Sequence, residues 1–257
     1  MTTPVEFPEL LRLIDERSAA FRDAVASAPS LDVRVPSCPE WTLFRLVEHL
    51  GGGDRFWAAV VAAGPTDAPS AEAAATRATV EAPRERDALV AWLADSTRAL
   101  IDALREAGPE RGCWTWWGAS RTPRHSGGVA RHRVQETAVH TYDAQLALGT
   151  PRPLPKATAL DGVDEFLNTC VATTSAWPHK PAVLDFHATE GEGRTWRLTL
   201  DADGARPGGA PGTADVSVHG TASDLVLFLY NRVPETSLRI DGDRGILDLL
   251  RDWEPEE

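Results

Sequence analysis

The sequence predicts a two-domain protein, with an all-α four-helix bundle over residues 1–150 and an α+β domain over residues 156–257. In the first part, apolar residues recur at helical spacing in four separate segments. The alternating prolines between Thr150 and Pro155 exclude a helix and form a stiff connector. Beyond this connector the pattern changes to short β-rich runs interleaved with helices. A chain of 257 residues is long enough to bury two cores.

The first two helices of the predicted bundle are separated by a proline-rich turn. Apolar residues from Phe7 to Val25 follow helical spacing and predict the first helix. The stretch from Pro36 to Trp41 is predicted as a turn, after which Thr42 can cap a second helix. The core stripe of that helix runs from Leu43 to Val61, and the glycines at 51–53 weaken its middle.

The third and fourth helices follow a long segment rich in alanine and proline. This segment, from Gly64 to Pro83, is predicted as a loop. The third helix has its apolar face between Leu89 and Leu104 and ends near Gly108. The fourth runs from about Gly128 to Leu148 and stops at Gly149. Four helices of this length make a bundle.

The predicted second domain mixes helices and short strands. A helix is expected over about Ala157–Ala172, and the Gly/Pro-rich stretch from Asp203 to Gly212 is expected to be a surface loop. The predicted strands are Ala182–Ala188, Thr195–Leu200, Val216–His219 and Ser237–Ile240, and the interleaved helices are Ala222–Tyr230 and Arg244–Trp253.

Composition narrows the classes of function. No apolar run approaches the roughly 18 residues of a membrane span, and the N-terminal residues lack a secretory signal, so we expect a cytoplasmic protein. The net charge of −12 and the lack of a basic stripe argue against nucleic acid and anionic membranes as partners. Three widely spaced cysteines, Cys38, Cys113 and Cys170, indicate reduced thiols. Small molecules are the expected partners, and the oligomeric state stays open.

A candidate metal site combines the second and fourth predicted helices. Glu136 and His140 are four residues apart, so both side chains project from one helix face and can bind the same ion. His49 is the natural third ligand from a facing helix, because Leu46 and Leu50 of the apolar stripe flank it. Two imidazoles and one carboxylate suit zinc or another divalent metal and leave an open coordination position.

The spacing alone also fits plainer interpretations. A Glu–His pair four residues apart often forms a hydrogen bond on a helix surface, and an inward histidine is often an ordinary core residue. Asp143, one turn beyond His140, is placed to orient an imidazole or to contact a ligand in the open position, or is a solvated carboxylate. His132 is a possible fourth ligand or supporting residue. The cluster of Trp114, Trp116 and Trp117 forms either a pocket wall or a core anchor.

The motifs together resemble the mycothiol-dependent maleylpyruvate isomerase family. They are Cys38-Pro-Glu-Trp-Thr, then Leu46-Val-Glu-His-Leu, then Glu136-Thr-Ala-Val-His-Thr-Tyr-Asp-Ala. The resemblance implies a DinB-like metal-binding four-helix bundle followed by a sterol-carrier-like α+β domain. The second domain is matched more loosely, by the segment from Leu225 to Arg232 and by Ile240-Asp-Gly-Asp.

The resemblance also implies a mechanism. The family's zinc ligands fall on His49, Glu136 and His140, and the thiol of mycothiol occupies the open position, where the metal favours the thiolate. Addition of this thiolate to an electrophilic substrate, rotation and departure give cis–trans isomerisation, whereas a retained adduct gives S-transfer. Arg232 matches an arginine that could bind a carboxylate of the substrate or the thiol.

Two other functions fit the same sequence. In a metal-dependent hydrolase, zinc-bound water rather than a thiol would be the nucleophile, with the same ligands. In a non-catalytic small-molecule-binding protein, the α+β domain would sequester an apolar ligand and the bundle would be a scaffold. Such families also diversify in substrate, so the family name does not fix the reaction of this member.

Overall fold

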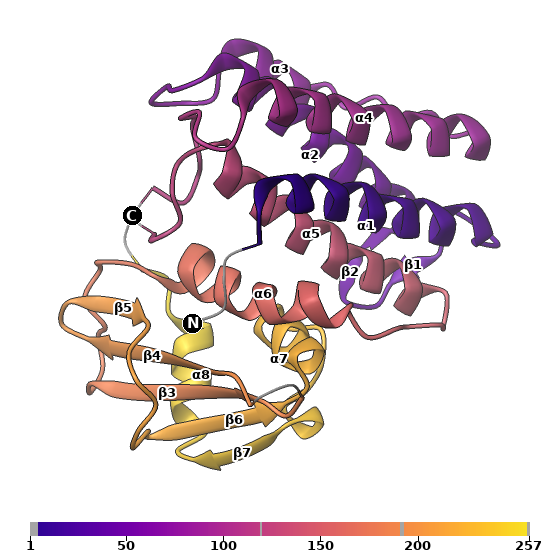
Figure 1. The fold of residues 1–257 in the computed structure, drawn as a ribbon. Helices are drawn as coiled ribbons and strands as arrows, with labels where there is room; N and C mark the ends of the chain where they lie inside the picture. The colour runs from indigo at the N-terminus through magenta and orange to yellow at the C-terminus, as the bar shows by residue number, and fades with distance from the viewer. Residues whose placement is uncertain (1–4, 119, 191–192, 256–257) are drawn as a thin grey trace. The chain divides into compact units, whose positions relative to one another are not determined.

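The computed structural model describes residues 5–118, 120–190 and 193–255. The chain divides into two compact units, one formed by Met1–Trp116 with Pro123–Leu154 and the other by Trp117–Thr122 with Pro155–Glu257. The first is helical and the second contains a mixed sheet with helices, as the sequence predicts (Figure 1). Residues 117–122 belong to the second unit although they precede the proline-rich connector. No helix in the described part of the chain is long and apolar enough to cross a bilayer.

The first unit is built around four long helices. They are α1 (Phe7–Ser27), α2 (Leu43–Ala63), α4 (Arg86–Ala107) and α5 (Ser126–Ala147). Helix α1 packs against α4 and α5, and α2 packs against the same two helices, so the four enclose a common core. Leu46 of α2 and Leu89 of α4 are fully buried in it. The cap predicted at Thr42 is present, because its side chain accepts a hydrogen bond from the Arg45 amide at 3.3 Å.

Two predictions for this unit were wrong in detail. The loop expected between Gly64 and Pro83 contains helix α3 (Ala71–Ala78), which packs on α2. Alanine is the best helix former, and Ser70 caps this helix by accepting a hydrogen bond from the Ala73 amide at 3.1 Å. The turn expected over residues 36–41 is a hairpin, in which β1 (Arg34–Val35) pairs with β2 (Cys38–Thr42).

The three consecutive glycines in α2 allow close packing. A Cβ atom on Gly51 would lie 2.1 Å from the ring of Trp92, and one on Gly52 would lie 2.6 Å from Val80. A Cβ on Gly53 would lie 3.2 Å from the Arg133 guanidinium. Glycine has a low helix propensity, but here it lets Val80 and the side chains of Trp92 in α4 and Arg133 in α5 come close to the backbone of α2.

The second unit is a five-stranded sheet with helices. Its strands are β3 (Ala182–Ala188), β4 (Thr195–Asp201), β5 (Gly204–Pro207), β6 (Val216–Gly220) and β7 (Arg239–Gly242). Their order in the sheet is β5-β4-β3-β6-β7, and only the β3–β6 pair is parallel. The helices are α6 (Lys156–Phe166), α7 (Ala222–Leu229) and α8 (Gly245–Asp252), with a π-helix at Leu167–Val171 and a 3₁₀ turn at Glu235–Ser237.

Side chains alternate across this sheet. Leu184 and Phe186 of β3 are fully buried on one face, which α7 covers. On the other face, Arg197 of β4 donates two hydrogen bonds, of 2.8 and 2.7 Å, to the carboxylate of Asp185. The sheet therefore has one apolar face toward the core and one polar face.

Three predictions for the second unit were wrong at element level. Strand β5 lies within the loop expected between Asp203 and Gly212. The helix expected to continue to Ala172 changes to a π-helix at Leu167, and the last strand begins at Arg239 rather than Ser237 because a 3₁₀ turn precedes it. In each case the difference lies in the pattern of backbone hydrogen bonds, which the spacing of apolar residues does not indicate.

Candidate metal centre

His49, Glu136 and His140 form a cluster in the helical unit. Helix α5 presents Glu136 and His140 one turn apart, and α2, which packs against α5, supplies His49. One ligand atom from each residue lies within 4.8 Å of the others, and His49 Nε2 is 2.9 Å from Glu136 Oε1. The structure thus brings together the three residues that the sequence nominates.

The chemistry of this donor set fits a divalent metal. The side chains are 39% exposed for His49, 20% for Glu136 and 10% for His140, so the cluster is accessible from the His49 side. Two nitrogen donors and one carboxylate oxygen are a usual zinc set. Three protein ligands leave a position for an external molecule.

His140 is held by a buried carboxylate. Its Nδ1 lies 2.8 Å from Oδ2 of Asp143, which leaves Nε2 as the ligand nitrogen. Asp143 is fully buried, and its Oδ1 accepts a 2.6 Å hydrogen bond from the Ser37 hydroxyl in the β1–β2 turn. Burial lowers the pKa of His140, and the attraction of Asp143 only partly opposes this shift. His140 is therefore neutral near pH 7, which is the form that binds metals.

Glu136 is held by a buried arginine that the motifs did not single out. Arg133 donates to Glu136 Oε2 at 2.7 Å and to Asp54 Oδ1 at 2.8 Å, and its side chain is 1% exposed. Asp54 in turn accepts a 3.0 Å hydrogen bond from the Thr97 hydroxyl. The signal for this contact is the spacing, because Arg133 lies three residues before Glu136 and therefore on the same helix face.

This arginine also keeps Glu136 ionised. Burial by itself raises the pKa of Glu136, but the charge of Arg133 and hydrogen bonds from His132 and His49 hold it well below its usual range. Oε2 is engaged by Arg133, so Oε1, the oxygen nearest His49, faces the cluster. The arrangement favours a carboxylate that binds a metal through one oxygen.

Aromatic side chains flank the cluster. The Trp41 ring centroid lies 4.8 Å from that of His49 and 6.3 Å from that of His140. On the other side, Trp116 packs edge-on against His132 at 5.5 Å, and His132 Nε2 lies 3.4 Å from Glu136 Oε2. His132 thus contacts the carboxylate rather than joining the three-residue cluster. The fold brings Trp41 of β2 beside imidazoles that lie in α2 and α5, which its place in a sequence motif does not indicate.

The remaining candidate residues are distributed over both units. Trp114 packs in the bundle, stacked on Trp57 with a centroid distance of 6.1 Å. Trp117 is buried and belongs to the second unit. Arg232 also lies in the second unit, where its Nη1 donates a 2.7 Å hydrogen bond to the carbonyl of Tyr230. The three cysteines form no disulfide.

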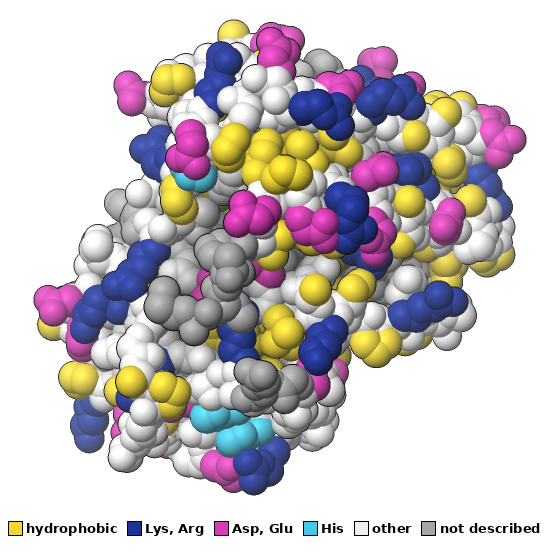
Figure 2. All heavy atoms as spheres, viewed as in Figure 1, with side chains coloured by type: hydrophobic (Ala, Val, Ile, Leu, Met, Phe, Trp, Pro, Cys, Tyr) yellow, Lys and Arg dark blue, Asp and Glu magenta, His cyan; other side chains and the backbone are white. Residues whose placement is uncertain are grey.

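Charge is mixed over the visible surface. Figure 2 shows acidic and basic side chains interspersed on the face that it presents, so the net charge of −12 is not gathered into one patch there.

Comparisons with known proteins cover both units. The family model described as the mycothiol maleylpyruvate isomerase N-terminal domain matches residues 11–145, and the MDMPI C-terminal domain matches residues 157–249. No curated protein matches. Among solved structures, a mycothiol-dependent maleylpyruvate isomerase and a histidine-to-alanine mutant of such an enzyme align with TM-scores of 0.62 and 0.64. Each is 17% identical, and each alignment covers 94% of this chain and 96% of the other.

Proposed function

Because this chain belongs to the mycothiol-dependent maleylpyruvate isomerase family, we propose that it is a thiol-dependent metalloenzyme that acts on a small electrophile. The proposed reaction is cis–trans isomerisation or S-transfer, with mycothiol as the thiol cosubstrate. The solved relatives are named for the isomerase activity, and this chain shares their fold. The observation that carries the proposal is the His49–Glu136–His140 cluster with its buried supports.

In the proposed mechanism these three residues hold a divalent metal, zinc by the chemistry of the donors. When bound, the metal supplies positive charge that favours the thiolate form of the cosubstrate at neutral pH. The two histidines contribute neutral nitrogens, and Glu136 contributes one negative charge. The metal and its three ligands together would then carry a net positive charge, which favours binding of the thiolate.

The surrounding residues would orient the ligands. Asp143 and Ser37 fix the ring of His140, and Arg133 with Asp54 fixes the carboxylate of Glu136. No cysteine of the chain belongs to the three-residue cluster, which agrees with an external thiol as the nucleophile. The same proposal places the protein in the cytoplasm, where thiols are kept reduced.

Arg232 is proposed to bind a carboxylate of the substrate or the cosubstrate. The support is the family resemblance and the chemistry of a guanidinium, which binds carboxylates with two parallel hydrogen bonds. Its Nη1 already bonds to the Tyr230 carbonyl, which restrains the side chain. A carboxylate-bearing electrophile is therefore the substrate class to assay first.

The test combines metal analysis with turnover. Metal content would be measured for the wild-type protein and for His49→Ala and His140→Ala, with His125→Ala as a control outside the cluster. Turnover of maleylpyruvate and of simple electrophiles would be followed with and without mycothiol. We expect one bound metal, its loss in both cluster variants, and activity only with the thiol. Undiminished metal in both variants would contradict the site, and metal-dependent turnover without thiol would favour a hydrolase.

A further inference from the structure

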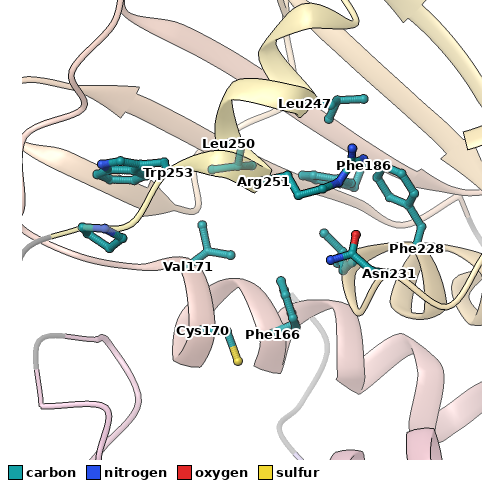
Figure 3. Close-up of a pocket in the computed structure, with 12 residues that line it drawn as sticks. Phe166, Cys170, Val171, Phe186, Phe228, Asn231, Leu247, Leu250, Arg251 and Trp253 are labelled. Carbon is teal, nitrogen blue, oxygen red and sulfur yellow. The ribbon is translucent and has the colours of Figure 1, made fainter. Parts of the chain in front are cut away.

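The second unit contains an apolar pocket of about 250 Å³ that the proposed thiol chemistry does not use. It is enclosed by β3, α7, α8 and the region where α6 passes into the π-helix (Figure 3). Four of its lining residues are aromatic: Phe166, Phe186, Phe228 and Trp253. An interior lined this way is typical of small-molecule sites rather than of packing defects.

The aromatic walls are held in place from outside the pocket. Phe166 packs edge-on against Tyr230 with a centroid distance of 4.7 Å, and Trp253 packs in the same manner against Trp177 at 5.0 Å. Phe186 is fully buried in the central strand of the sheet. Because neighbouring rings fix these side chains, the walls resist collapsing into the space between them. The pocket is therefore preformed, and a ligand would lose little affinity to reorganisation.

One wall is formed by unusual backbone. Helix α6 continues as a π-helix over Leu167–Val171, and Val171 lines the pocket from the end of this segment. A π-helical turn is rare and frequently occurs at functional sites. The π-helix therefore points to a functional site at this pocket, independently of the pocket's volume and lining.

Asn231 and Arg251 lie together at one end of the pocket, beside Phe186 and Phe228 (Figure 3). Arg251 is paired with Asp248 at 3.1 Å and with Glu235 at 3.4 Å, so its charge is already balanced. Asn231 lies just after α7, where its φ of 58° lets the chain turn, and it offers an uncharged amide. A bound molecule would find hydrogen-bonding partners here but no surplus of positive charge.

We propose that this pocket binds an uncharged aromatic molecule with about ten carbon atoms and a single hydroxyl or carbonyl group. The size follows from comparison with cavities of about 150 Å³, which hold one benzene ring. A fused pair of rings fits the larger volume. The ring system would contact the aromatic walls, and the polar group would meet Asn231 and Arg251. The site lies within the second unit and is distinct from the metal cluster.

The probe for the test is 2-naphthol, titrated calorimetrically into the full-length protein. We expect saturable binding of one equivalent. Leu250→Trp fills the pocket from α8, because Leu250 lines it, and should weaken binding by about tenfold or more, as expected when a well-fitting apolar contact is lost. The matched control is Leu249→Trp, since Leu249 is the preceding residue, is 39% exposed and is not among the residues that line the pocket. It should leave the affinity unchanged.

A second variant and a second probe complete the test. Val171→Phe fills the pocket from the opposite wall. It replaces Leu250→Trp in the binding test if circular dichroism shows that Leu250→Trp does not fold. The carboxylate 2-naphthoate should bind more weakly than 2-naphthol; tighter binding would overturn the uncharged ligand class. The proposed site would be overturned if the wild-type protein showed no saturable binding of 2-naphthol. It would also be overturned if both filled variants bound 2-naphthol as tightly as the wild type.

Discussion

Asp143→Ala is the most informative change at the candidate metal centre. Asp143 is fully buried and accepts hydrogen bonds from the Ser37 hydroxyl at 2.6 Å and, at 2.8 Å, from the ring of His140. The alanine variant removes both acceptors while leaving the three proposed metal ligands in place. If Asp143 orients His140, the variant should bind metal more weakly and should also unfold more easily.

The structure sets the size of both effects. Each lost bond involves a charged acceptor, and a buried donor left without a partner costs about 1–3 kcal/mol. The ring of His140 is such a donor, whereas the Ser37 hydroxyl is half-buried and can bond to water, so the expected loss in the free energy of unfolding of the metal-free protein is about 1–3 kcal/mol. Metal affinity should fall by about 10- to 100-fold, as is usual when the partner of a ligating histidine is removed. Asp143→Asn keeps the shape and one acceptor oxygen for the His140 ring, and the Ser37 hydroxyl can turn to accept from its amide, so this variant should lose less of each.

The assay pairs chelator competition for metal affinity with urea unfolding of the metal-free protein. Ser37→Ala is the matched control, because it removes the hydroxyl but leaves the Asp143–His140 contact. It should reduce stability by about 1 kcal/mol with little change in metal affinity. An Asp143→Ala protein that folds and binds metal as tightly as the wild type would refute the proposed role of Asp143.

Three further changes test other parts of the structure. Arg133→Met leaves the buried Asp54 and the partly buried Glu136 without their countercharge, so urea unfolding should show a loss of about 3–5 kcal/mol. Arg232→Ala should raise KM for a carboxylate-bearing electrophile while metal content stays constant. Burial and the nearby charges of His187 and Arg239, opposed by Asp241, lower the pKa of His219. The unfolded chain therefore takes up this proton first, and stability falls as the pH drops below about 6.5.

Each of these expectations has a contrary result. An Arg133→Met protein as stable as the wild type would mean that the ion pairs of Arg133 with Asp54 and Glu136 do not stabilise the fold. Unchanged KM for Arg232→Ala with a carboxylate substrate would remove that residue from the site. For His219, the comparison is with His219→Gln, which should lose less stability than the wild type between about pH 7 and about pH 5. Equal losses in the two proteins would contradict the lowered pKa.

Much of the architecture was predictable because periodicity reports which face of an element is buried. The four long helices and β3 were predicted close to their observed bounds, and glycines end α4 and α5 where expected, with φ of 71° at Gly108 and 72° at Gly149. Helix α3 and strand β5 were missed. Alanine-rich and Gly/Pro-rich sequences carry little periodic signal, so their structure depends on the partners they pack against or pair with.

The sequence by itself determined the fold class, the family and the grouping of His49, Glu136 and His140, because helical spacing and short motifs are local properties. Only the tertiary structure decided what surrounds them. Arg133 became a buried partner of Glu136, and Ser37 became the support of Asp143 although the two are 106 residues apart. The pocket of the second unit has the same origin, since its walls come from segments that meet only in the folded chain. Burial and long-range contact are decided by packing, which no single segment encodes.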